Sequence, residues 1–267
     1  MNNLIHPDID PAIHAEILKR LVCIEQGHDV KIICAIESGS RAWGFPSPNS
    51  DYDTRFIYVH RKDWYLSLNP GRDVIELPID ADYDINGWDL KKALGLLLKS
   101  NPVMLEWLSS PIRYIWQSED CAKLVTFAKT LAHRKACLHH YVRLGQSCFK
   151  DNISGRDKVK LKKYFYAIRP ALAIHWLRDF PDKAPPMNIF DIMDKITVPS
   201  DMKSDLDHLL ALKRAAKETG MGWPIASIDN YCAAQFKWAQ SFLKDYDPIH
   251  VDREQDANLL FLNMIHT

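Results

Sequence analysis

The spacing of apolar residues predicts strands mixed with helices in the first part of the chain and helices almost alone in the second. Between Asp10 and Gly27 apolar residues recur every three or four positions, which predicts a helix. The β-branched run 31–36 predicts a strand, and the run 53–60 predicts a second one. Two shorter strand pieces follow within 73–89, where a proline prevents one long strand.

From Asp89 onwards the helical period prevails. Asp89 suits the N-cap of a helix whose apolar positions run to Leu98, and Pro102 starts another helix. Further helices are predicted at 118–132, 133–151, 156–180, 202–219, 228–245 and 253–265. The pattern therefore predicts an α+β chain with two domains, a mixed domain over residues 1–115 and a helical domain over residues 116–267.

Composition excludes few classes of function. The chain has 267 residues, 47% of them hydrophobic, so it can bury a substantial core. Lys and Arg together number 34, as do Asp and Glu, so no net charge draws the chain to nucleic acid or to an anionic membrane. No apolar run approaches the roughly 20 residues that span a bilayer, and no basic-then-apolar leader begins the sequence, so we expect a cytoplasmic protein. Six scattered cysteines favour reduced thiols over disulfides or zinc.

Two aspartates stand at the start of the second predicted strand, in the segment "SDYD". Residues two apart on a strand point to the same face, so Asp51 and Asp53 lie side by side there. Like charges so close repel unless a cation lies between them, and Mg²⁺ prefers carboxylate oxygens. The pair therefore indicates either a metal site for a nucleoside triphosphate or an ordinary turn before a strand.

Upstream of this pair, Gly39 and Ser40 follow the first predicted strand. A glycine turn after a strand leaves backbone N–H groups that can bind phosphate oxygens, and Ser40 can add its hydroxyl and Arg41 a cation. Gly-Ser alone is also a common turn. Gly39 and Ser40 therefore indicate a phosphate-binding turn only in combination with the aspartates that follow them.

A third carboxylate is needed to complete a two-metal site. The predicted strand piece "DYDINGWD" offers Asp82 and Asp84, and Asp89 is accounted for as an N-cap. Asp84 is the preferred ligand because Asp82 lies nearer the incoming loop, although Asp82 stays open as the alternative.

Five segments together resemble the DNA polymerase β-type nucleotidyltransferase superfamily. Within it they resemble the RNA repair-associated nucleotidyltransferase family of bacteria and phages, also called RlaP or YcgL-like. The segments are "SGSRAWGF", "SDYDTRFIYV", "GWDLKKAL", "LLKSNPVMLEWLSSPI" and "KKYFYAIRPALAIHW". The resemblance covers about residues 30–192. It implies a small twisted mixed sheet with flanking helices, followed by a helical domain.

The resemblance also implies roles for the acidic residues. Asp51 and Asp53 would bind two Mg²⁺ ions, and Asp84 would complete the site of the ion nearer the nucleophile. Gly39 and Ser40 would bind the triphosphate. Arg41 and Arg55 would either contact phosphate or neutralise the acids.

In the predicted helical domain the resemblance points to one basic segment. Relatives commonly bind the triphosphate with a basic residue and the base with an aromatic one from such a domain, and the candidates are Lys162, Lys163, Tyr166 and Arg169. An exposed basic face on an amphipathic helix accounts for them equally well.

The function that follows is Mg²⁺-dependent transfer of a nucleotidyl group from an NTP, with ATP preferred, to an acceptor hydroxyl. An RNA 3′ end or tRNA is the acceptor favoured by the family, and a protein or small molecule is the alternative. A catalytically inactive nucleotide-binding protein is a further alternative, which the presence of all three carboxylates disfavours.

Overall fold

The computed structural model describes residues 5–80, 82–215, 220–247 and 251–265, and the chain divides into two compact units. The first unit takes the described residues of Met1–Ala42, Asp51–Leu131 and Val251–Thr267. The second takes Trp43–Ser50 and the described residues of Ala132–His250. The loop between Ala42 and Asp51 thus belongs to the helical second unit.

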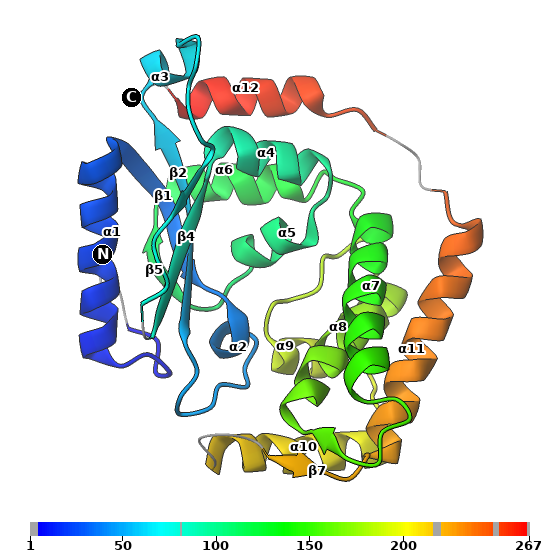
Figure 1. The fold of residues 1–267 in the computed structure, drawn as a ribbon. Coiled ribbons are helices and arrows are strands. Elements are labelled where there is room, and N and C mark those ends of the chain that lie inside the picture. Colours follow the sequence, from blue (N-terminus) through cyan, green and yellow to red (C-terminus); the bar gives the residue numbers. More distant parts are fainter. Residues whose placement is uncertain (1–4, 81, 216–219, 248–250, 266–267) are drawn as a thin grey trace. The chain divides into compact units, whose positions relative to one another are not determined.

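A five-stranded mixed sheet forms the centre of the first unit, as predicted (Figure 1). Its strand order is β3 (Val74–Glu76), β4 (Tyr83–Asp89), β2 (Tyr52–His60), β1 (Val30–Glu37) and β5 (Arg113–Trp116). β2 and β4 run parallel, whereas the other neighbouring pairs are antiparallel. This confirms the α+β class and the mixed sheet.

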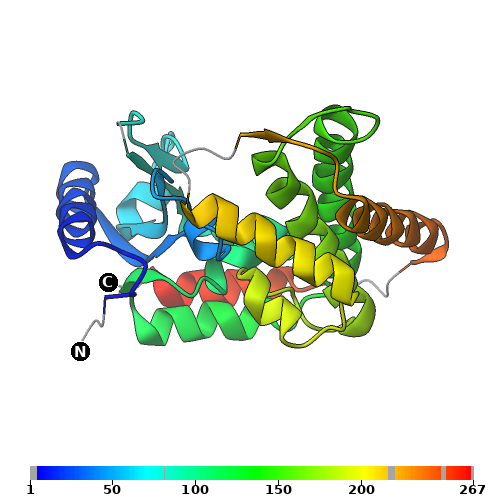
Figure 2. The same cartoon turned by 90° about the horizontal axis from the view of Figure 1, so that it is seen from below.

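Helices cover both faces of this sheet. The helices of the first unit are α1 (Pro11–His28), α2 (Gly39–Ala42), α3 (Lys62–Leu66), α4 (Leu90–Leu98), α5 (Pro102–Leu108), α6 (Ser118–Ala128) and α12 (Glu254–Met264). α1 packs on β1 and β5, while α4 and α6 lie on the opposite face (Figure 1). α12, drawn in red, lies along α4 and α6 (Figures 1 and 2).

The alternation of side chains along β2 decides where its polar residues point. Phe56 and Tyr58 are fully buried in the core that α1 covers. Because successive side chains on a strand point to opposite faces, Asp53 and Arg55 project to the other face, with Ile57. The polar start of β2 is therefore on the side of the sheet away from α1.

The helical second unit is built around α8. Its elements are α7 (Arg134–Asn152), β6 (Val159–Lys160), α8 (Lys162–Asp179), α9 (Ile189–Met193), α10 (Ser200–Ala215), β7 (Met221–Gly222) and α11 (Ala226–Asp245). α8 contacts α7, α9 and α11, and most of its side chains are buried.

Most predicted elements are confirmed with shifted bounds. Asp89 is the N-cap of α4, since its side chain accepts a hydrogen bond from the Lys91 N–H. The helix predicted at 156–180 is wrong at its start, because Val159–Lys160 pairs as a strand with Met221–Gly222. The end of the helix predicted at 202–219 lies outside the described residues.

Two sequence expectations concern the cysteines and the membrane. All six cysteines are free thiols, as predicted. Within the described residues, none of the helices has the length and apolarity to cross a bilayer.

The proposed domain boundary at 115/116 stays a prediction. The chain passes from the first unit to the second after Leu131, so α6 lies in the first unit.

Candidate active site

Asp53 and Asp84 are direct neighbours on the parallel strands β2 and β4. In this register Asp53 pairs with Asp84 and Arg55 with Asn86, so all four side chains project from the same face of the sheet. The carboxylates are partly exposed, with 28% of the Asp53 side chain and 29% of the Asp84 side chain accessible. The sheet thus brings together two of the three acids that the sequence predicted.

Arg55 holds these two carboxylates together. Its Nη2 donates to Asp84 Oδ2 at 2.6 Å and to Asp53 Oδ1 at 3.2 Å, and its Nη1 donates to the Asp84 carbonyl at 2.7 Å. Two roles were predicted for Arg55, contact with phosphate or neutralisation of the acids. In this geometry its guanidinium neutralises the two carboxylates. A cation therefore already lies between Asp53 and Asp84.

Gly39 lies against the carboxylate of Asp53. Its φ of +58° belongs to the left-handed region, and a Cβ added there would overlap Asp53 Oδ2. The backbone is fixed nearby, because the Ser38 N–H donates to the Asp53 carbonyl at 2.8 Å. Glycine at position 39 therefore leaves the space that the Asp53 carboxylate occupies.

A fourth acid, Glu37, lies beneath this group and was not predicted from the sequence. Glu37 is fully buried; its Oε1 accepts a hydrogen bond from the Asp53 N–H at 3.0 Å and its Oε2 one from the Tyr114 hydroxyl at 2.7 Å. Burial raises the pKa of Glu37 to about 8, against the opposing effect of these two hydrogen bonds. Glu37 therefore anchors the backbone of Asp53 as a neutral group at pH 7.

The electrostatics of Asp53 reflect its neighbours. Burial raises the pKa of Asp53, the Arg55 guanidinium opposes this rise, and the charges of Asp84 and Asp51 add to it. The same repulsion is what an added cation would relieve.

Asp51 and Arg41 lie at the edge of the group. Asp51 is exposed just before β2, close enough for its charge to act on Asp53. Arg41 is buried; its guanidinium stacks over the Tyr52 ring at 3.8 Å, and its Nε donates to the Asp51 carbonyl at 3.4 Å. Arg41 therefore supports the start of β2 from within the first unit.

The alternative third acid, Asp82, lies differently from Asp84. Asp82 is exposed, and its carbonyl accepts a hydrogen bond from the Tyr52 N–H at 2.7 Å. Asp84, by contrast, shares Arg55 with Asp53. The geometry brings Asp84, rather than Asp82, to the side of Asp53.

Oxygen ligands at this place suit magnesium. Within the part of the chain that the structure describes, no group of three or more His, Cys, Asp or Glu side chains is set to hold a metal ion. Asp53 and Asp84 nevertheless present carboxylate oxygens to a shared cation, the guanidinium of Arg55. Their donor chemistry fits a hard divalent cation.

Comparison with known proteins agrees with the motifs. A family model described as "RlaP: RNA repair pathway DNA polymerase beta family" matches residues 13–263. The chain belongs to this family. It is also 40% identical over 250 residues to the uncharacterized protein YcgL of Bacillus subtilis (strain 168), covering 93% of this chain and 95% of that protein.

Among solved structures, a nucleotidyltransferase-like protein from Exiguobacterium sibiricum 255-15 is 11% identical to this chain. The match covers 93% of this chain and 79% of that one, with a TM-score of 0.27. A TM-score this low supports no conclusion about the fold or the function of this chain.

The basic and aromatic candidates of this family member all lie on α8 of the second unit. Lys162 is exposed, and Lys163 and Tyr166 are partly buried. Arg169 is only 2% exposed, with its guanidinium 5.5 Å from the Trp43 ring and 5.3 Å from the Tyr141 ring. The first three are accessible to a ligand, whereas Arg169 lies in the interior of its unit.

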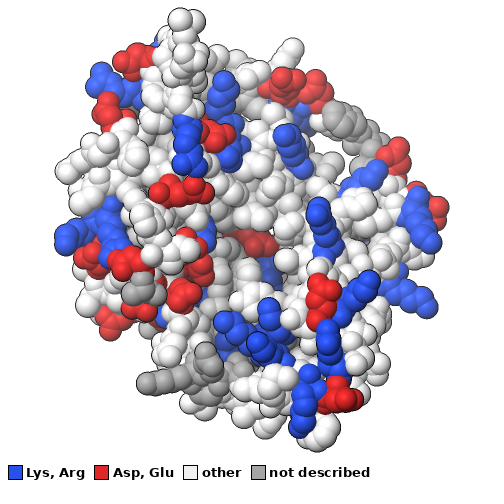
Figure 3. Space-filling view, viewed as in Figure 1, with Lys and Arg blue, Asp and Glu red and all other residues white. Residues whose placement is uncertain are grey.

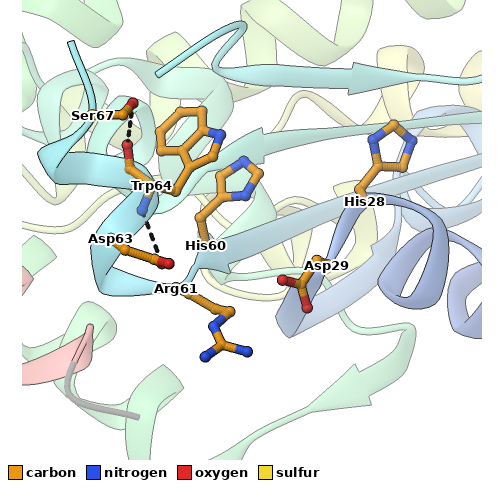
Figure 4. A pocket seen from close by; sticks show the side chains of 7 residues that line it. All are labelled: His28, Asp29, His60, Arg61, Asp63, Trp64 and Ser67. Carbon is orange, nitrogen blue, oxygen red and sulfur yellow. Dashed lines mark hydrogen bonds between the residues drawn. The ribbon is translucent and has the colours of Figure 1, made fainter. Parts of the chain in front are cut away.

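A separate hollow of about 270 Å³ lies at the far end of β2 from Asp53 (Figure 4). In it the rings of His60 and Trp64 stack with their centroids 3.8 Å apart. The side chains of Arg61 and Asp29 point into the open space below them (Figure 4). The residues that line it are His28, Asp29, His60, Arg61, Asp63, Trp64 and Ser67. None of them is one of the predicted site residues.

Proposed function

We propose that this protein is a Mg²⁺-dependent nucleotidyltransferase that moves a nucleotidyl group from ATP or another NTP to an RNA 3′ hydroxyl. The observation that carries the proposal is the pairing of Asp53 with Asp84 on adjacent parallel strands, with Gly39 against the Asp53 carboxylate. Membership of a family described by an RNA repair pathway supports RNA as the acceptor. Because NTPs and RNA ends meet in the cytoplasm, we place the activity there.

Asp51, Asp53 and Asp84 are the residues that would hold the metal, as two ions. When bound, magnesium neutralises charge on the transferring phosphate and lowers the pKa of the acceptor hydroxyl. Arg55 supplies a positive charge to Asp53 and Asp84 within the protein itself, since its Nη2 forms ion pairs with both carboxylates. Glu37 holds the Asp53 backbone in place from beneath the sheet.

The triphosphate would be bound by the turn at Gly39 and Ser40, which lies against Asp53. The acceptor oxygen forms a bond to the α-phosphorus, the bond from that phosphorus to the bridging oxygen of pyrophosphate breaks, and the hydroxyl proton is released. Arg41, in the same turn, stacks its guanidinium over the Tyr52 ring at the start of β2. Within the second unit, Lys162, Lys163 and Tyr166 remain the candidates that the family resemblance implies for phosphate and base contacts, and Arg169 lies beside the rings of Trp43 and Tyr141.

The acceptor is tested by offering each α-labelled NTP with Mg²⁺ to matched RNAs that end in a 3′ hydroxyl or a 3′ phosphate. We expect label on the 3′-hydroxyl RNA only. Label on the protein itself or on an added protein acceptor, with none on RNA, would contradict the RNA proposal. Absence of label on every acceptor, with NTP still bound, would favour the inactive nucleotide-binding alternative.

A further inference from the structure

The short ribbon formed by β6 and β7 in the second unit has one packed face and one open face. Its register pairs Val159 with Gly222 and Lys160 with Met221. Val159 is fully buried, and a Cβ added at Gly222 would overlap the side chain of Leu161, so this pair belongs to the packed face. Because neighbouring residues on a strand point to opposite faces, Lys160 and Met221 belong to the open face.

The open face continues with a second lysine and an exposed tryptophan. Lys158 and Trp223 flank the strand pair on the same side as Lys160 and Met221, and the Lys158 Nζ lies 3.3 Å from the centre of the Trp223 ring. Trp223 is 69% exposed, so Lys158 covers at most one face of its ring. Of the eight tryptophans, all of them within the described residues, Trp223 alone is exposed. We call these four residues the Trp223 face.

The charges of the Trp223 face lack counter-ions. Among the described residues, neither Lys158 nor Lys160 forms an ion pair with a carboxylate. The segment 156–163 holds five Lys or Arg and one acid, Asp157. On the face drawn in Figure 3, Lys and Arg also gather over the lower part of this unit. Since an exposed tryptophan adds little burial to folding, its place among unpaired cations indicates a binding partner.

We propose that the Trp223 face binds a single strand of RNA, with a base stacked on the Trp223 ring and phosphates held by Lys158 and Lys160. Aromatic rings bind unstacked bases of any sequence, and lysines bind the backbone. An apolar protein surface would leave both lysines uncompensated, so a polyanion fits this face better. The choice of RNA as the polyanion rests on the proposed function. None of the four residues is among those proposed to bind the NTP.

The test measures binding of a fluorescein-labelled single-stranded RNA of about 12 nucleotides to the full chain by anisotropy, without NTP and in EDTA. Trp223→Leu removes the ring but keeps an apolar side chain, whereas Trp223→Phe keeps a ring. We expect Trp223→Leu to weaken binding about fivefold or more and Trp223→Phe to retain most of it. A duplex of the same sequence should bind more weakly to the wild type and should not respond to Trp223→Leu, because its bases are already stacked.

Lysine variants test the phosphate contacts. Lys158→Met and Lys160→Met should each weaken binding and lower the slope of log affinity against log salt concentration by about 0.7. Lys237→Met, at an exposed position on α11, is the matched control and should change neither quantity. Because the substituted side chains are exposed, we expect all variants to melt near the wild-type temperature.

Wild-type affinity for RNA in Trp223→Leu would overturn the proposal, as would absence of RNA binding by the wild type. Self-association of the wild type that Trp223→Leu abolishes, with RNA affinity unchanged, would overturn it too, because the face would then contact a second copy. Loss of RNA binding in Trp223→Leu without nucleotidyl transfer by the wild type would uphold the Trp223 face and reject the proposed function. Transfer with an unchanged KM for RNA in Trp223→Leu would do the reverse.

Discussion

Asp53 and Asp84 lie opposite each other because β2 and β4 pair in parallel register, and Arg55 donates hydrogen bonds to both carboxylates. The parallel pairing brings together residues that are far apart in the sequence, and the alternation of side chains puts them on one face. Two neighbouring carboxylates that share a cation form the kind of oxygen site that magnesium prefers. Three substitutions follow from this arrangement and its surroundings, and a fourth concerns Lys213, a buried lysine of the second unit.

Gly39→Ala is expected to destabilise the protein by about 1–3 kcal/mol and to lower transfer at least about tenfold. An alanine at a φ of +58° is strained, and its methyl group would displace the Asp53 carboxylate. Chemical denaturation and transfer of label measure the two effects. Gly95→Ala is the matched control: it lies inside α4 with open space around it, and we expect it to be neutral or slightly stabilising. Equal behaviour of the two variants would remove the role given to Gly39.

Arg55→Met is expected to make stability depend on magnesium. Without the guanidinium, Asp53 and Asp84 repel, so the free energy of unfolding in EDTA should fall by about 1–3 kcal/mol. Millimolar Mg²⁺ should restore much of this loss, as a rise in melting temperature that the wild type shows only weakly. Arg72→Met removes a guanidinium from the exposed Glu76 and should change stability by less than about 0.5 kcal/mol in either buffer. A melting temperature of Arg55→Met that ignores Mg²⁺ would speak against a metal at these acids.

Glu37→Gln should change how stability depends on pH. The folded pKa of Glu37 is about 8, above its ordinary value of 4.5, so the folded protein holds one more proton than the unfolded chain between these values. Stability of the wild type therefore falls as pH rises through that window, by on the order of 1–3 kcal/mol from this group. The glutamine stays neutral and keeps an acceptor for the Asp53 N–H, so its curve should fall less. Denaturation at pH 5, 6.5 and 8 measures this, and parallel curves would show that Glu37 is ionised in the folded protein.

Lys213→Met should stabilise the protein at pH 7, by on the order of 1–3 kcal/mol, because it replaces a buried charge with an apolar side chain. The folded pKa of Lys213, about 8, lies below its ordinary value of 10.5. The unfolded chain therefore binds more protons between pH 8 and 10.5, and wild-type stability from this group rises with pH there. The gain from the substitution should accordingly shrink above pH 8. Denaturation at pH 7 and 10 checks this, and a destabilised variant at pH 7 would contradict it.

The sequence was sufficient to predict that Asp53 and Asp84 lie together, because the period of two along each strand and the family motif both favour it. Glu37 was missed because it ends an apolar run just before Gly39, where an exposed strand end is expected. Glu37 could have been found from its position, because it directly follows the apolar run 31–36 and stands beside the candidate site. Its partner Tyr114 stands on β5, and only the folded sheet brings the two together.

Lys213 could have been found from periodicity. Met202, Leu206 and Leu209 form the buried stripe of α10, and Lys213 continues it at helical spacing. Lysines are seldom buried, so such a position reads as the exposed edge of the stripe. The strand Val159–Lys160 could not be predicted from the sequence. Two residues are too few to show the alternation of a strand, and their partner Met221–Gly222 lies far along the chain.

The most direct test of the carboxylate pair compares label transfer from α-labelled ATP, with Mg²⁺, to an RNA 3′ hydroxyl in three folded variants. Asp53→Asn and Asp84→Asn keep the side-chain shape but remove the charge, whereas Asp82→Asn changes an exposed acid outside the pair. The account predicts that the first two lose transfer by at least about 10²-fold and that Asp82→Asn stays near the wild type. Transfer at the wild-type rate in Asp53→Asn or Asp84→Asn would contradict it.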